Sequence, residues 1–288
     1  MMADLNSILP GNIPGTFFVD STCIDCDLCR QIAPTFFKAE AGYSVVCCQP
    51  RSSGEMHDVK KAILACPTGS IGSRAKLDLG EAVNAYPDPV EANVYFCGYS
   101  SRDSFGASSY LIVRPEGNVL IDSPRFTRRL VNRLEEMGGV STMFLTHRDD
   151  VADHEKFHAH FGCKRIIHES ESSGVLAEQL LRGIDATSLD DSLIAIPTPG
   201  HTKGHVVLLY QNFLFTGDHL AWSPYYKHLV AFRHHNWYSW SATIRSMSRL
   251  LEYNFEWILP GHGRRAHYHG DLMRKKISEC VEWMKQVE

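Results

Sequence analysis

Residues 142–154 read TMFLTHRDDVADH, an apolar, strand-like run that leads directly into histidine and aspartate. Three later segments share this arrangement, because each places a histidine or an aspartate where an apolar run ends. They are TPGHTKGH at 198–205, FTGDH at 215–219 and LPGHG at 259–263. Loops that follow strands converge on one edge of a sheet, so residues far apart in sequence can meet there. The four segments together predict a site built around metal ions.

This ordered set resembles the metallo-β-lactamase superfamily, which carries H-x-H-x-D-H, then a histidine, an aspartate and a last histidine. The resemblance covers about residues 93 to 265, and the last three segments match well. It implies an αββα sandwich that holds one or two divalent ions of zinc, iron or manganese. The metal ligands that it implies are His147, Asp149, Asp153, His154, His201, Asp218 and His262. Asp153 and Asp218 are the implied catalytic residues.

The first segment departs from the family motif. Asp149 stands where the family has its second histidine, and the pair Asp153–His154 lies two residues further along than the motif permits, which predicts a bulge. Asp150 is expected to be solvated. A carboxylate is a harder ligand than an imidazole and favours iron or manganese over zinc. Flavodiiron proteins look similar in this respect, since they have an acidic residue at the same place and reduce oxygen or nitric oxide at a di-iron site.

A second pattern lies near the N-terminus, where Cys23, Cys26 and Cys29 are followed by a remote Cys66–Pro67. Two residues between cysteines let a loop wrap one face of an iron–sulfur cube, and the fourth ligand must then come from elsewhere. Zinc is the rival interpretation, but Cys₄ zinc sites usually pair two Cys-x-x-Cys units. Disulfides are a weaker alternative, because the close triple spacing suits a shared metal and we expect no secretory signal in the first fifteen residues.

The cysteine segment resembles single-cluster bacterial ferredoxins over roughly residues 16 to 71. Two-cluster ferredoxins have a fourth cysteine before a proline, and here Ala33 stands before Pro34. Met56, Val59 and Ala62 occupy the places of the remaining cysteines of a second cluster. The resemblance therefore implies one [4Fe–4S] cluster. Its implied ligands are Cys23, Cys26, Cys29 and Cys66.

The length of 288 residues suits one small domain followed by one of ordinary size. We predict a ferredoxin-like module at 1–75, a linker at 76–92 and a metallo-β-lactamase-like domain at 93–288, because the stretch between the two patterns is polar and contains Pro87 and Pro89. The expected fold class is α/β, with an N-terminal α+β module followed by an αββα sandwich.

The composition limits the partners. The hydrophobic fraction is 44% and no uncharged apolar run is long enough to span a bilayer, so we expect no membrane partner. A formal net charge of −4 without a long basic block argues against nucleic acid. We expect a reducing, cytoplasmic location, a small-molecule substrate and, if the cluster exchanges electrons, an electron-transfer partner protein.

Three functions stay open at this level. The first, which we prefer, is a metal-dependent hydrolase with a redox or regulatory cluster, because most relatives with the later motifs are hydrolases. The second is an oxidoreductase in which the cluster feeds electrons to an iron or di-iron site, and fusion of the two modules favours it. The third is an electron-transfer or binding protein whose altered first segment no longer supports catalysis.

Overall fold

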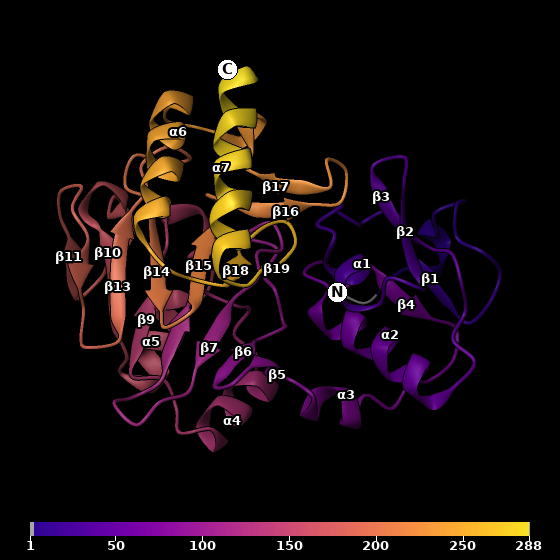
Figure 1. The fold of residues 1–288 in the computed structure, drawn as a ribbon. Helices are drawn as coiled ribbons and strands as arrows, with labels where there is room; N and C mark the ends of the chain where they lie inside the picture. The colour runs from indigo at the N-terminus through magenta and orange to yellow at the C-terminus, as the bar shows by residue number, and fades with distance from the viewer. Residues whose placement is uncertain (1–2, 288) are drawn as a thin grey trace. The chain divides into compact units, whose positions relative to one another are not determined.

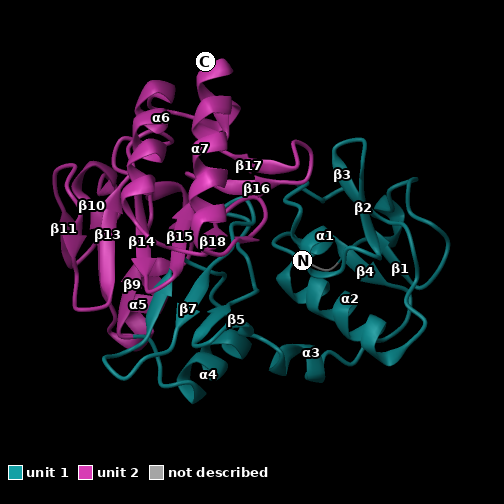
Figure 2. Ribbon diagram, viewed as in Figure 1, with its two compact units in different colours: residues 1–140 teal, residues 141–288 magenta. Residues whose placement is uncertain are grey.

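The computed structural model describes residues 3–287, which divide into two compact units. The first ends at Val140 and the second begins at Ser141 (Figure 2). This division lies well beyond the linker expected at 76–92, so the first unit contains the cysteine segment and also the beginning of the expected C-terminal domain. No helix among residues 3–287 is long and apolar enough to cross a membrane.

The cysteine segment forms a small α+β module in the first unit (Figure 1). In chain order its elements are η1 (Leu5–Ser7), β1 (Phe17–Val19), α1 (Leu28–Ile32), β2 (Phe37–Glu40), β3 (Tyr43–Val46), α2 (Ser53–Ala65) and β4 (Ile71–Ser73). Strand β1 pairs antiparallel with β4, and β2 with β3. A capping box between Ser52 and Glu55 starts α2, and Cys66 ends it. Buried apolar residues from β1, β3, α2 and β4 form one core, which holds the two cysteine-bearing ends together.

The rest of the first unit is an antiparallel sheet with two helices. Its elements are α3 (Gly80–Asn84), β5 (Asp88–Glu91), β6 (Val94–Phe96), β7 (Tyr110–Ile112), β8 (Val119–Ile121) and α4 (Arg128–Glu136). Strands β5 to β8 are neighbours in chain order. Helix α3 and strand β5 lie in the expected linker, and Lys61 of α2 contacts Asp88 of β5 at 2.7 Å. The stretch 76–92 is therefore largely ordered structure in contact with the module.

The second unit contains two larger groups of strands and one antiparallel pair, which residues 221–223 form with residues 228–230. Its elements up to β14 are β9 (Thr142–Phe144), η2 (Arg148–Asp150), α5 (His154–Phe161), β10 (Lys164–His168), η3 (Glu169–Glu171), β11 (Gln179–Leu181), β12 (Thr187–Ser188), β13 (Leu193–Pro197) and β14 (Val206–Tyr210). Those that follow are β15 (Phe213–Gly217), β16 (Ala221–Ser223), β17 (His228–Val230), η4 (Arg233–His235), α6 (Trp240–Arg249), η5 (Leu250–Glu252), β18 (Trp257–Pro260), β19 (Ala266–His267) and α7 (Gly270–Gln286). Strands β9, β10 and β11 pair in parallel. A six-stranded sheet has the order β12-β13-β14-β15-β18-β19.

The six-stranded sheet buries its apolar side chains against α6 and α7. Ile196, Val207 and Ile258 from the sheet share a core cluster with Met247 of α6 and Ile277 of α7. Figure 1 shows these two helices side by side over the sheet. The apolar strand cores explain why polar metal ligands are confined to the loops at the strand ends.

Candidate metal centres

The cysteine ligands come from one wrapped loop and one helix end. The loop between β1 and α1 carries Cys23 and Cys26, with left-handed backbone at Asp25 (φ 58°) and Asp27 (φ 66°). Arg30 stabilises this turn, since its guanidinium contacts Asp25 at 2.6 Å and Asp27 at 2.5 Å. The strained turns between the cysteines let successive thiols face one centre.

The environment of the thiols fits a cationic cluster. Burial raises the pKa of Cys26 to about 12, and the neighbouring thiols Cys66 and Cys23 raise it too. Burial likewise raises the pKa of Cys29 above its usual range, with the same neighbours contributing. Four thiolates in such a place need strong positive charge to be stable, which irons supply. The backbone N–H of Ser44 lies 3.4 Å from the sulfur of Cys23, a contact of the kind that tunes cluster potentials.

The second centre starts where β9 ends. His147 is fully buried, and its Nδ1 lies 3.0 Å from the hydroxyl of Thr146. Its Nε2 has no hydrogen-bond partner within residues 3–287. Burial lowers the pKa of His147 to about 4. A neutral imidazole with one nitrogen held by a neighbour and the other free is the form that binds a metal ion.

Two groups of candidate ligands meet at this histidine. The first consists of His147, Asp149 and His201, and the second of His147, Asp150 and Asp218, each with ligand atoms within 4.8 Å of one another. Oδ2 of Asp149 lies 3.9 Å from Nε2 of His147 and 3.5 Å from Nε2 of His201. The ligand atoms of each group are close enough together for a single ion to bind all of them.

Asp218 lies between the two groups. Its Oδ2 is 3.7 Å from Nε2 of His147, 3.6 Å from Nε2 of His201 and 3.9 Å from Nε2 of His262. Burial alone would raise the pKa of this carboxyl, but the charges of these three histidines keep it below its usual value. A carboxylate that faces three imidazoles through one oxygen is placed to bridge two ions.

Asp150 completes the second group, although its expected position was in solvent. Its side chain is almost fully buried, and Oδ1 lies 3.8 Å from Nε2 of His262. A Cβ on Gly261 would come within 2.8 Å of Asp150 Oδ2 and 3.1 Å of Asp218 Oδ1, so a larger residue there would force both carboxylates to shift. The signal for Asp150 was its place three residues after His147, which a turn of 3₁₀ helix returns to the same side.

The structure does not bring Asp153 and His154 into this cluster. Asp153 is the residue before α5 and binds Lys156 at 2.6 Å, while Nδ1 of His154 lies 3.3 Å from Arg165. The chain turns into η2 directly after His147, so Asp149 and Asp150 lie at the end of the strand. Asp153 and His154 lie further along the chain, at the start of α5. The ligand roles expected for Asp153 and His154, and the catalytic role of Asp153, stay predictions that these contacts do not support.

Two further side chains hold the site together. His205 is buried, accepts a hydrogen bond from the backbone N–H of Asp218 at 3.2 Å and contacts Thr198 through its other nitrogen at 2.9 Å. Glu171 is fully buried, accepts from Gly204 N–H at 2.6 Å and contacts Nε of Arg148 at 2.9 Å. No motif indicated a role for Glu171, since it lies outside all four segments.

Two segments of the chain match known families. Residues 19–73 match the model described as the 4Fe-4S single cluster domain of Ferredoxin I, and residues 143–262 match the metallo-beta-lactamase superfamily. These are the two families that the motifs predicted, each matched over its own segment of the chain. An iron–sulfur cluster and divalent metal ions are supported as its cofactors.

Solved metallo-β-lactamases share the fold. VMB-1 is 16% identical with a TM-score of 0.54, covering 69% of this chain and 96% of its own. DIM-1 is 18% identical with a TM-score of 0.55, covering 68% and 95%. An enzyme from Hirschia baltica is 14% identical with a TM-score of 0.52, covering 68% and 95%. These likenesses confirm the expected αββα fold and nothing finer. No curated protein matches the chain by sequence.

Proposed function

We propose that this protein is a metal-dependent hydrolase whose C-terminal domain holds two divalent ions. The observation that carries the proposal is the position of Asp218, whose single Oδ2 lies within 4 Å of three different histidines. The proposed ligands are His147, Asp149, Asp150, His201, Asp218 and His262. His147, Asp149 and His201 would hold one ion, Asp150 and His262 the other, and Asp218 both.

The ligand set suits hydrolysis. Two divalent ions held here would lower the pKa of a bound water towards about 7 and polarise a carbonyl or phosphoryl oxygen of the substrate. Three carboxylates leave two such ions with a net charge of +1, so one further anionic oxygen from water or substrate neutralises the site. Buried His205 and Glu171 hold the loops that carry the ligands, which fixes the geometry before substrate arrives.

The substrate we propose is a small molecule with an apolar part. Trp237 is 65% exposed, and its ring centroid lies 6.3 Å from that of His201. The backbone N–H groups of Trp237 and Tyr238 both donate to the carbonyl of His201, which anchors this aromatic segment beside the ligand. Exposed aromatic rings at the rim of a polar site provide a stacking surface for a substrate.

Activity assays with matched variants test this proposal. We expect anaerobically purified protein to hydrolyse a chromogenic phosphodiester or thioester, and we expect Asp218→Ala to lower kcat/KM by at least 100-fold, which corresponds to about 2.7 kcal/mol. Trp237→Ala should raise KM with little change in kcat, because it removes binding surface and no ligand. Hydrolysis that persists unchanged in Asp218→Ala would refute the assignment.

An oxidoreductase is the second candidate, and Asp149 is the observation that favours it. A carboxylate in place of an imidazole, together with Asp150 and Asp218, gives a donor set that prefers iron or manganese over zinc. The same chain carries a cluster that exchanges single electrons. Metal analysis separates the candidates: iron beyond four atoms per chain, with reoxidation of the reduced protein by oxygen that is lost in Asp149→Ala, supports the redox function.

A further inference from the structure

Three potential metal ligands gather outside both ligand sets described above. Glu256 precedes β18, His267 ends β19 and His269 precedes α7. Their ligand atoms lie within 4.8 Å of one another. The antiparallel register pairs Trp257 with His267, and Tyr268 N–H donates to the carbonyl of Glu256 at 3.0 Å. Backbone pairing between these segments therefore holds the three side chains close to one another.

The orientations of the side chains are also fixed. The ring of His267 stacks on Trp257 with centroids 4.4 Å apart and an interplanar angle of 5°. The ring of His269 lies edge-on to the ring of His267, with the centroids 4.4 Å apart. Nδ1 of His269 is 3.3 Å from Oε1 of Glu256. Nε2 of His267 is buried and has no hydrogen-bond partner within residues 3–287. A buried nitrogen without a partner is costly unless something binds it.

We propose that Glu256, His267 and His269 form an additional binding site for a divalent transition-metal ion, best suited to zinc. Two imidazoles and one carboxylate form a ligand set that zinc uses when its fourth position stays open. The site shares no residue with the six proposed ligands of the hydrolytic centre. It is independent of the proposed function, because it needs neither that centre nor the cluster.

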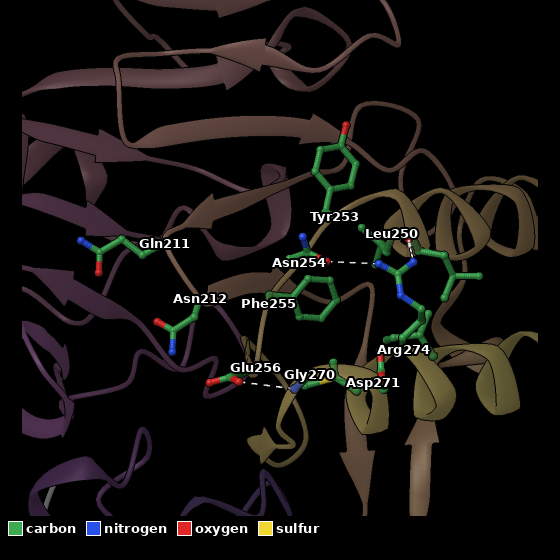
Figure 3. A pocket seen from close by; sticks show the side chains of 13 residues that line it. Gln211, Asn212, Leu250, Tyr253, Asn254, Phe255, Glu256, Gly270, Asp271 and Arg274 are labelled. Atoms are coloured by element: carbon green, nitrogen blue, oxygen red, sulfur yellow. Dashed lines mark hydrogen bonds between the residues drawn. The ribbon is translucent and has the colours of Figure 1, made fainter.

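The site lies at the rim of a pocket. Glu256 and Gly270 line a cavity of about 380 Å³ together with Asn212, Asp271 and Arg274. Figure 3 shows the Glu256 carboxylate turned towards the backbone of Gly270, which donates to Oε1 at 3.4 Å. An ion on Glu256 would therefore lie beside a hollow lined by both polar and apolar side chains, and its open coordination position could take water or a small anion.

The start of α7 limits the affinity. The first N–H groups of a helix carry partial positive charge and repel a cation. Glu256 offsets this effect, because its carboxylate accepts a hydrogen bond from the backbone N–H of Gly270. We therefore expect micromolar binding.

Equilibrium dialysis of the cluster-loaded protein against micromolar free zinc, followed by metal analysis, tests the site. Wild-type protein should retain one zinc ion per chain more than His269→Ala, and Glu256→Gln should lose the same ion. His269 has a side chain that is 79% exposed, so the alanine variant should fold normally. His160→Ala removes another exposed histidine and should bind as much zinc as wild type.

Two further measurements make the result decisive. Added zinc should raise the melting temperature of wild type and of His160→Ala, but not that of His269→Ala, because binding stabilises only a protein that has the site. Asp218→Ala should keep the ion, which separates this site from the hydrolytic centre. Equal zinc content in wild type and His269→Ala would overturn the proposal.

Discussion

Asp150 and Asp153 are three positions apart and have opposite surroundings. Asp150 is buried beside His262, whereas Asp153 binds Lys156 at 2.6 Å at the start of α5. Without a cation nearby, a buried carboxylate would be expensive, whereas a partly exposed one beside a lysine is not. At the scale of single residues, burial therefore separates a proposed ligand from an ordinary surface ion pair.

This difference predicts the effect of removing each charge. Asp150→Asn should weaken the binding of one ion at the C-terminal centre, because it removes the negative charge of a proposed ligand. The loss of affinity should exceed the 10–100-fold or so that follows when a residue supporting a ligand is removed. Asp153→Asn is the matched control and should keep the full metal content. Metal analysis after dialysis measures both. If Asp153→Asn loses metal and Asp150→Asn does not, Asp153 is the ligand, as the family motif implies.

Gly106 is a second residue with a specific role, because its backbone lies against a cluster ligand. Its φ is +85°, and a Cβ there would be 2.7 Å from Cβ of Cys26 and 3.1 Å from its sulfur. Gly42 has a similar φ of +78° but nothing within 4 Å of an added Cβ. Comparing substitutions at Gly106 and Gly42 therefore separates the effect of backbone strain from the effect of contact with Cys26.

Gly106→Ala should speed loss of the cluster in air and destabilise the protein by about 2–5 kcal/mol, the sum of strain and overpacking. Gly42→Ala should cost only the strain, about 1–2 kcal/mol, and leave the cluster lifetime unchanged. The decay of the visible absorbance of the cluster and chemical denaturation measure the two effects. Equal decay rates in both variants would contradict the contact.

At the scale of elements, η3 connects two of the ligand-bearing loops. Its last residue, Glu171, accepts from Gly204 N–H in the loop between β13 and β14 and contacts Arg148 of η2. These loops carry His201 on one side and Asp149 on the other. One buried carboxylate therefore holds together two loops that are distant in sequence.

Glu171→Ala should lower the free energy of unfolding by about 2–3 kcal/mol, because it leaves the buried N–H of Gly204 without a partner. It should also weaken metal binding while the ligands themselves remain. Glu169→Ala, in the same turn but with a side chain 47% exposed, should change stability by less than about 0.5 kcal/mol. Urea denaturation measures both, and equal midpoints would contradict a connecting role for Glu171.

At the scale of the whole molecule, the two metal centres use separate residues from separate units. The four cysteines lie in residues 1–140, and all six proposed ligands of the other centre lie in residues 141–288. Neither ligand set includes a residue of the other. Each cofactor should therefore bind without the other.

Cys26→Ala should abolish the visible absorbance of the cluster and leave the metal content of the C-terminal domain intact. Cys47→Ala is the control, because Cys47 is a free thiol outside the ligand pattern. Absorbance spectra and metal analysis of protein purified without oxygen provide the measurement. If Cys26→Ala loses both metals, the two centres are not independent.

The sequence by itself determined the two families, the single cluster and the αββα fold. These follow from local features: cysteine spacing, the missing second ligand set at Ala33 and Met56, and apolar runs that end in histidine or aspartate. Such features survive in a linear chain, because each ligand segment is short and its strand precedes it directly. The boundaries at 75 and 93 stay a prediction, and ordered structure occupies much of the stretch between them.

Only the tertiary structure decided which aspartate of 149–154 faces His262, that Glu171 connects two loops, and that Glu256 meets His267 and His269. Each depends on the direction a side chain takes after a tight turn or on strand register between distant segments. Backbone geometry of this kind is set by the packing of the whole domain, so the three-residue spacing from His147 to Asp150 was a hint and not a prediction, and no motif pointed to the other two features.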